Sequence, residues 1–214
     1  DPSKVASVAS FFVSRVDSAV DALLESKIQN GESGFEHLLG KTAIANAALA
    51  YRDFQETVAS DRFVSLQAKG AHVQRPLWAS TGTKNPAYSD VLYIESLIGP
   101  DTVNTTPPAT LTSFLDHGNA MPTLVDAIEE SEQIMVDLAA SGVNITEVTH
   151  KLLVDGVNSF ADSFNTLIAN VEEKKARLLA KQHASSQVSL GEHQAAVEST
   201  LSDLGENDVP GRIW

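Results

Sequence analysis

The chain has 214 residues, and with 43% of them hydrophobic it is long enough to bury a sizeable core. Its 15 Lys and Arg residues against 28 Asp and Glu give a net charge of −13, which argues against nucleic acid and against an anionic membrane as partners. It has no cysteine, which excludes disulfides and thiolate chemistry and favours a reducing, cytoplasmic setting.

The first element is expected to be a strand. Residues 5–14 (VASVASFFVS) form a continuous run of apolar and small residues, which predicts a parallel strand covered on both faces. Because this run begins so soon after Asp1 and Pro2, we expect the chain to belong to a longer one. No apolar run approaches the roughly 18 residues of a membrane span, and no signal peptide is expected.

The next elements are expected to be helices. Apolar residues at positions 20, 23, 24 and 28 have helical spacing, and a break at residues 31–34 follows them. An alanine-rich stretch over residues 42–58 predicts a second helix that packs closely against a neighbour. Residues 61–70 predict a short third helix that ends at Gly70.

Two strand–loop–helix units come next. Residues 76–79 predict a strand, followed by a loop over residues 80–84 and a helix over residues 87–98. Residues 102–106 predict a third strand, which leads through two prolines into a helix over residues 109–118. This repetition is typical of parallel βα architecture.

The rest of the chain is expected to be helical. Three separate helices are predicted from apolar residues around positions 124–138, 145–152 and 157–171. We expect residues 1–182 to form the main domain and residues 183–214 a polar connector or tail with a short helix over 195–204. Three strands with so many helices indicate either a helical fold with a small sheet or one part of a barrel.

Polar side chains follow each predicted strand. The carboxyl ends of parallel strands meet at one edge of a sheet, so these side chains are expected to converge there. Cations, hydroxyls and an amide in one place suit a phosphorylated polyol. The candidates are Ser10, Arg15 and Asp17, then Ser80 and Lys84, then Asn104, Thr105 and Thr106.

Simpler roles remain open for the same residues. Arg15 is also placed to pair with Asp17 or Asp21 on the following helix. Ser80 and its neighbour can serve only to satisfy loop backbone groups. Lys84 can form an imine, bind an anion or simply be solvated, and imine formation requires a desolvated site.

No metal site and no P-loop is predicted. The six histidines are scattered without metal-ligand spacing. The segment STGTKN lacks the glycine spacing of a phosphate loop. The acidic residues at 129, 130 and 132 fit a solvated helix face.

Three segments resemble the transaldolase family, in its long bacterial branch. They are VASFFVSRVD, RPLWASTGTKNPAYSDVLYIESLIGPDTVNTTPPATLTSFLDHG and GVNSFADSFNTLI. The resemblance covers about residues 1–180 and implies an α/β fold, the C-terminal portion of a helix-rich (β/α)8 TIM barrel. The three predicted strands then correspond to its sixth, seventh and eighth strands, surrounded by their helices.

The resemblance implies a transferase that moves a dihydroxyacetone unit from sedoheptulose 7-phosphate to glyceraldehyde 3-phosphate without a metal or organic cofactor. In this family a lysine on the fourth strand forms an imine with the ketose, and an aspartate and a glutamate on the first and third strands move protons. None of those strands matches this chain. The resemblance therefore places the catalytic residues in the N-terminal half of the barrel and implies that this chain alone is inactive.

What the resemblance carries over is substrate binding. Ser10 and Arg15 match the sixth-strand serine and arginine that meet substrate hydroxyl and phosphate, and Ser80 matches the seventh-strand serine. In shorter-branch relatives an arginine follows that serine by two residues, whereas here the cation, Lys84, follows by four. Asn104 lies at the end of the eighth strand, where it is expected to line the site.

The tail LGEHQAAVESTLSDLGENDVPGRIW resembles the connector in fusions of transaldolase with a phosphoglucose isomerase domain. The expected partners are therefore sugar phosphates, the N-terminal half of the barrel and such a fused domain. A different class stays open, a non-catalytic helical scaffold that retains half a barrel and whose exposed strand edges a partner covers. An aldolase that uses Lys84 itself is a further alternative.

Overall fold

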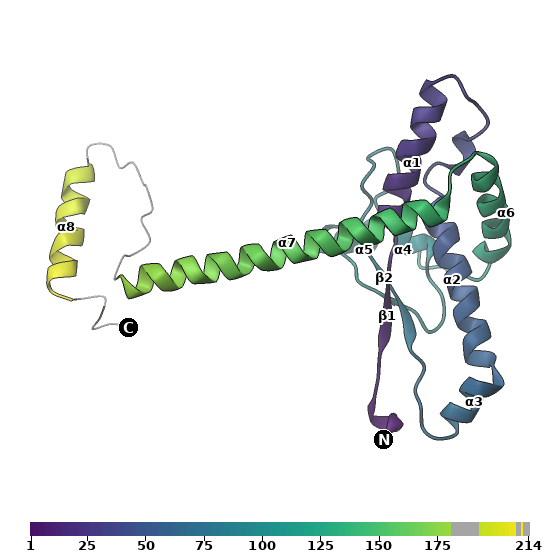
Figure 1. Cartoon of the computed structure of the whole chain (residues 1–214), viewed down its shortest axis with the longest axis horizontal. Helices are drawn as coiled ribbons and strands as arrows, with labels where there is room; N and C mark the ends of the chain where they lie inside the picture. The colour runs from purple at the N-terminus through teal and green to yellow at the C-terminus, as the bar shows by residue number, and fades with distance from the viewer. Residues whose placement is uncertain (181–192, 209–210, 212–214) are drawn as a thin grey trace. The chain divides into compact units, whose positions relative to one another are not determined.

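The computed structural model describes residues 1–180, 193–208 and 211. The chain divides into two compact units, Asp1–Asn158 and Ser159–Trp214. The domain boundary expected between residues 182 and 183 lies outside the described residues. Figure 1 shows the elements of both units in chain order.

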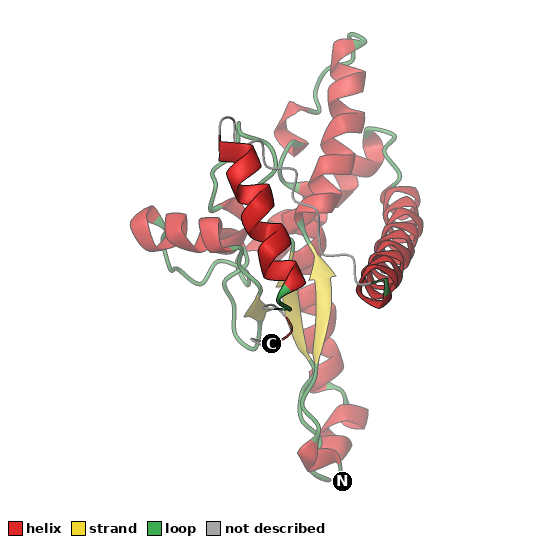
Figure 2. Ribbon diagram, turned by 90° about the vertical axis from the view of Figure 1, so that its left-hand side faces the viewer, coloured by secondary structure: helices red, strands yellow, loops and turns green. Residues whose placement is uncertain are grey.

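The first unit is built on a small parallel sheet. Its strands are β1 (Val8–Phe12), β2 (Arg75–Ala79) and β3 (Val103–Asn104), in the order β1-β2-β3, and both pairings are parallel. Figure 2 shows the two longer strands side by side. The predicted parallel βα arrangement is thus confirmed, and the carboxyl ends of the three strands lie at one edge.

The third strand is shorter than the predicted range 102–106. The Thr105 N–H still donates to the Trp78 carbonyl at 2.9 Å, but the chain then reaches Pro107 and Pro108. Proline has no N–H to donate to a neighbouring strand and is well suited to begin a helix, so α5 starts at Pro108.

The expectation that the first strand is covered on both faces is wrong. Val8 is 41% exposed and Phe12 is 43% exposed, and only Phe11 is partly buried, edge-on against Trp78 at 5.8 Å between ring centroids. Within the described part of the chain, β2 is the only strand that pairs with β1. The strand is therefore a sheet edge, and no described element covers the face of Val8 and Phe12.

Helices surround this sheet and provide most of the core. In chain order they are α1 (Ser14–Gln29), α2 (Thr42–Ala59), α3 (Asp61–Gln67), α4 (Leu92–Ser96), α5 (Pro108–His117) and α6 (Ala127–Ala140), with short 3-10 turns at Pro2–Lys4 and Glu36–Leu38. The alanine-rich α2 packs against both α1 and α6, as its small side chains predicted. Trp78, Tyr51 and Tyr93 are the largest fully buried side chains.

Helix α4 occupies only part of the range 87–98 predicted for it. The Asn85 side chain accepts a hydrogen bond from the Ala87 N–H at 3.0 Å, and the Ser89 hydroxyl accepts one from the Val91 N–H at 3.3 Å. Such side-chain bonds offer the backbone an alternative to helical pairing. The segment therefore turns before the helix begins at Leu92.

A single helix, α7 (Ile145–Leu179), replaces the two helices predicted between residues 145 and 171. Gly156 alone does not interrupt it, because a glycine inside a helix costs only about 1 kcal/mol. The apolar residues from Val157 to Val171 on this helix are largely exposed. Helix α8 (Gln194–Glu206) confirms the short helix predicted in the tail. No helix in the described ranges is long and apolar enough to cross a membrane.

Candidate functional site

Ser10 and Ser80 come from adjacent parallel strands at different heights. Ser10 is an exposed residue within β1 and pairs with Leu77, and Ser80 follows the last residue of β2. Ser80 thus lies three positions beyond the partner of Ser10, a rise of about 10 Å along the sheet. Ser10 therefore lies on β1 and Ser80 just after β2, and the register does not bring the two serines to the same level.

Arg15 lies in the first turn of α1, directly after β1, and is exposed. Its guanidinium carbon is 5.2 Å from the centroid of the Phe12 ring, a cation–π arrangement that leaves N–H donors available. Within the described ranges it forms no ion pair. The alternative pairing of Arg15 with Asp17 or Asp21 is wrong, because both carboxylates are buried and hold other partners.

Ser80 adopts an uncommon backbone conformation. Its φ of 59° lies in the left-handed region, which non-glycine residues seldom occupy. The Ser80 carbonyl accepts a hydrogen bond from the Ser14 N–H at 3.1 Å, and the Ala79 carbonyl accepts one from the Val13 N–H at 2.9 Å. These bonds attach the start of α1 to the end of β2. Arg15 and the loop of residues 80–84 are therefore neighbours through the backbone.

The Asn104 side chain binds the 80–84 loop and lies on the opposite face of the sheet from Ser10. The register puts Asn104 in the same row as Trp78, whereas Ser10 is in the row of Leu77, so the two side chains belong to opposite faces. The Asn104 side-chain oxygen accepts a hydrogen bond from the fully buried Thr81 hydroxyl at 2.9 Å. The loop is thus anchored to the end of β3.

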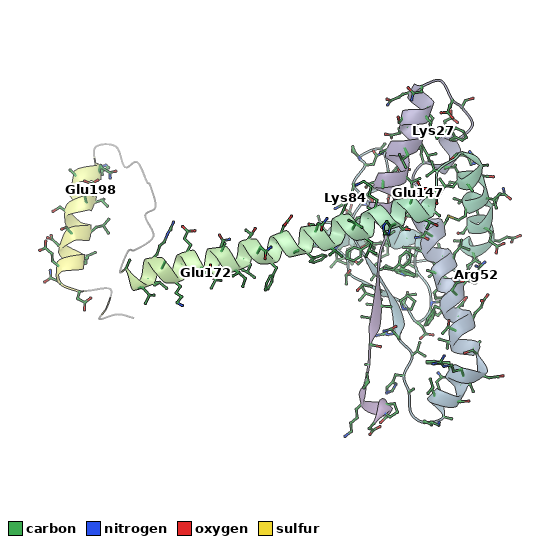
Figure 3. All side chains as sticks on the ribbon, in the orientation of Figure 1. Lys27, Arg52, Lys84, Glu147, Glu172 and Glu198 are labelled. Atoms are coloured by element: carbon green, nitrogen blue, oxygen red, sulfur yellow. The ribbon has the colours of Figure 1, made fainter. Side chains whose placement is uncertain are left out.

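Lys84 is an exposed residue of the loop that follows β2 (Figure 3). It makes no hydrogen bond or ion pair with any part of the chain that the structure describes. An amine that attacks a carbonyl needs desolvation or a neighbouring cation to be activated. This arrangement suits an anion ligand or a solvated lysine, and not a nucleophile.

Two acids of α1 are buried. Asp17, expected as a site residue after the first strand, is held inside the fold instead, and Asp21 was not recognised from the sequence as more than a possible partner of Arg15. Asp17 is 1% exposed, and its two oxygens accept hydrogen bonds from the Ala43 N–H at 2.6 Å and the Tyr93 hydroxyl at 2.8 Å. Asp21 accepts from the Gly40 N–H at 3.1 Å and the Tyr88 hydroxyl at 2.8 Å. We call Asp17, Asp21, Tyr88 and Tyr93 the acid–tyrosine cluster. The available signal was two acids four residues apart on the apolar face of a helix.

Burial dominates the electrostatics of this cluster. Desolvation raises the pKa of Asp17 from 3.8 to about 6, although the hydrogen bonds from Ala43 and Tyr93 act in the opposite direction. Burial also raises the pKa of Asp21, again against the hydrogen bonds that it accepts. Desolvation and the nearby carboxylates raise the pKa of both tyrosine hydroxyls, which stay protonated and donate.

The described ranges contain no group of three or more His, Asp or Glu side chains arranged to hold a metal ion. The polar groups near the strand ends are the hydroxyls of Ser10 and Ser80, the amide of Asn104 and the exposed cations of Arg15 and Lys84. Such groups can bind and orient an anionic, hydroxylated molecule.

Comparison with known proteins identifies the family. A family model described as Transaldolase/Fructose-6-phosphate aldolase matches residues 3–171. A transaldolase of Trichodesmium erythraeum is 45% identical over 185 residues, covering 83% of this chain and 49% of the relative. Transaldolases of Frankia alni and Mycolicibacterium smegmatis are 48% and 49% identical, covering 83% and 78% of this chain and 47% and 45% of their own lengths.

The chain thus spans about half the length of the curated relatives that it matches. The match of the family model to residues 3–171 nevertheless includes all three strands and the loops that follow them. This confirms the resemblance seen in the sequence, and the chain belongs to the transaldolase/fructose-6-phosphate aldolase family.

Proposed function

We propose that this chain is the C-terminal half of a transaldolase barrel and contributes the sugar-phosphate-binding side of its active site. The reaction is the transfer of a dihydroxyacetone unit from sedoheptulose 7-phosphate to glyceraldehyde 3-phosphate. The observation that carries the proposal is Arg15, which has no ion-pair partner among the described residues and follows β1 beside the backbone of the 80–84 loop. Members of this family have a TIM-barrel-like α/β fold, and the small parallel sheet among helices agrees with it.

Each site residue has a role that its chemistry suits. Arg15 binds the substrate phosphate, because its planar set of N–H donors matches phosphate oxygens. Lys84 adds a second, mobile positive charge to the same group. The hydroxyls of Ser10 and Ser80 bind substrate hydroxyls. Asn104 lines the end of β3 and holds the loop through Thr81.

The carbon–carbon bond is broken by a lysine outside this chain. That amine forms an imine with the ketose carbonyl, and the imine takes up the electron pair when the bond breaks. Lys84 is unsuited to this step because it is exposed to solvent, and an imine-forming amine needs a desolvated site. On this proposal, the chain alone binds substrate and does not turn it over.

The edge of β1 and the apolar cavity beside it suit the N-terminal half of the barrel as a binding partner. Among the described strands, only β2 pairs with β1, so β1 has a free edge, and its residues Val8 and Phe12 are exposed. A cavity of about 430 Å³ between the β1–β2 pair and α2–α3 is mostly apolar and includes Phe11, Phe54 and Trp78. An added parallel strand pairs with the free edge, and apolar side chains that accompany it fill the cavity. We also propose that the tail connects this chain to a phosphoglucose isomerase domain.

Complementation tests this proposal. The chain is mixed with the N-terminal half of a related transaldolase, and transfer from sedoheptulose 7-phosphate to glyceraldehyde 3-phosphate is assayed. We expect activity from the mixture and none from either half. A chain that forms no complex, gives no activity and shows no thermal shift with sugar phosphates would instead be the non-catalytic scaffold.

A further inference from the structure

The acid–tyrosine cluster joins three segments that are far apart in the sequence. Asp17 and Asp21 lie one turn apart on α1. Each carboxylate accepts from one backbone N–H, that of Ala43 in the first turn of α2 or that of Gly40 just before it, and from one tyrosine hydroxyl of the segment after β2. Because every carboxylate oxygen has a partner, the cluster fixes the relative positions of α1, α2 and residues 88–93.

The packing around the cluster leaves little freedom. Asp17 and Tyr93 are 1% and 2% exposed, and Asp21 is 6% exposed. Gly40 has a φ of 71°, and a Cβ atom placed on it would lie 2.8 Å from Tyr88 Cζ. The Tyr88 ring therefore packs directly on the Gly40 backbone, and the Tyr88 hydroxyl reaches Asp21 from there.

Two proposed site groups are attached to this cluster. Arg15 lies two residues before Asp17, in the same turn of α1. The 80–84 loop runs directly into the segment that carries Tyr88 and Tyr93. The Ser14 N–H also donates a hydrogen bond to the Ser80 carbonyl, which joins the residue before Arg15 to the first residue of the loop. Movement of the tyrosine segment therefore moves the loop relative to Arg15.

We propose that the acid–tyrosine cluster is a set of positioning residues that holds Arg15 and the 80–84 loop at the spacing needed to bind one phosphate group together. This inference rests on the proposed function, since it assigns the phosphate to Arg15 and the loop. The cluster touches no substrate. It acts through the two segments that do, in the way that outer hydrogen bonds orient the residues that contact a ligand.

The test measures binding of fructose 6-phosphate to the purified chain by calorimetry. Tyr93→Phe and Tyr88→Phe each remove one hydroxyl and keep the ring. The matched control is Tyr51→Phe, since Tyr51 is 2% exposed and its hydroxyl donates to the Pro100 carbonyl at 3.1 Å, outside the cluster. Arg15→Ala identifies binding at the proposed site.

We expect the Kd for fructose 6-phosphate to rise roughly three- to tenfold in either cluster variant, with stoichiometry unchanged, and to stay at the parent value in Tyr51→Phe. A purely structural role would reduce the binding-competent fraction, seen in the stoichiometry, and leave the Kd unaltered. Tyr88→Phe suffices if Tyr93→Phe does not fold, since Tyr88 is only partly buried.

Two results would overturn the inference, and they are distinguishable. If the parent chain binds fructose 6-phosphate, Arg15→Ala abolishes binding and both cluster variants keep the parent Kd, the positioning role is wrong while the proposed function stands. If the parent chain shows no saturable binding, or binding that Arg15→Ala does not weaken, the proposed function fails and the inference fails with it.

Discussion

The guanidinium of Arg15 stacks over the ring of Phe12, with 5.2 Å between its Cζ atom and the ring centroid. Both residues lie where β1 passes into α1, and Arg15 has no acidic partner in the ranges that the structure describes. A cation held by an aromatic ring at the end of a strand is oriented without being neutralised. This relationship leads to the first prediction.

Arg15→Ala is expected to weaken binding of phosphorylated sugars by roughly 10- to 100-fold, the loss that accompanies removal of a hydrogen bond to a charged group. In the complemented enzyme the same change should raise the KM for sedoheptulose 7-phosphate. Calorimetry and steady-state kinetics measure the two effects.

The matched control is Arg52→Ala. Arg52 is paired with Glu132 between α2 and α6 at 2.6 Å and lies outside the strand-end site (Figure 3). We expect it to leave sugar-phosphate affinity unaltered. Equal affinities of Arg15→Ala and the parent would remove Arg15 from the phosphate site.

At Ser80, the cost of the backbone conformation can be measured separately from the loss of substrate binding. Because its φ is 59°, glycine should be more stable than alanine here by about 1 kcal/mol. Both Ser80→Gly and Ser80→Ala remove the hydroxyl, so both should lose affinity for the sugar phosphate. Urea unfolding and calorimetry on the pair measure this, and an alanine variant as stable as the glycine variant would contradict it.

Asp17 should give the chain a pH-dependent stability. Its pKa is raised from 3.8 to about 6 by burial, so between about pH 4 and pH 6 the folded chain binds more protons than the unfolded chain. The free energy of unfolding should therefore fall as the pH rises through this window, by at most about 3 kcal/mol from this group.

Asp17→Asn removes the titrating group and keeps an oxygen that can accept from the Ala43 N–H. Urea unfolding of the parent and the variant from pH 4 to pH 7 should give curves that diverge across the window, the parent losing stability relative to the variant as the pH rises. Parallel curves would show that the Asp17 carboxyl does not titrate there.

Gly40→Ala is expected to destabilise the first unit by about 2–3 kcal/mol. The substitution places a side chain in the left-handed region and within 2.8 Å of the Tyr88 ring. The control is Gly156→Ala on α7, where no atom lies within 4 Å and alanine is the better helix former. Thermal unfolding should separate the two, and equal melting temperatures for Gly40→Ala and the parent would be inconsistent with this packing.

The order of elements and the parallel strands could be predicted from the sequence because they depend on local patterns. The apolar run around Ser10, the prolines after Asn104 and the alanines of α2 each act on their own segment. The extents of α4 and β3 were less predictable, since side-chain bonds from Asn85 and Ser89 and the missing N–H of Pro107 decide them.

Less of the site than of the fold could be predicted from the sequence. The strand-end positions of Arg15 and Ser80 follow from the βα pattern, whereas Ser10 lies in the middle of β1. The burial of Asp17 does not, because its tyrosine partner lies 76 residues further along the chain. That distant hydroxyl, together with the start of α2, is what directs the acid inward and leaves Arg15 unpaired. The exposure of β1 likewise depends on what covers it, which no local pattern encodes.

Reductive trapping shows which half of the barrel carries the imine-forming lysine. The chain, its complementing N-terminal half and their mixture are each treated with borohydride in the presence of fructose 6-phosphate, and sugar adducts are mapped by peptide mass spectrometry. We expect an adduct on a lysine of the N-terminal half and none on this chain. An adduct on Lys84 would contradict this expectation, because the reactive amine would then belong to the chain itself.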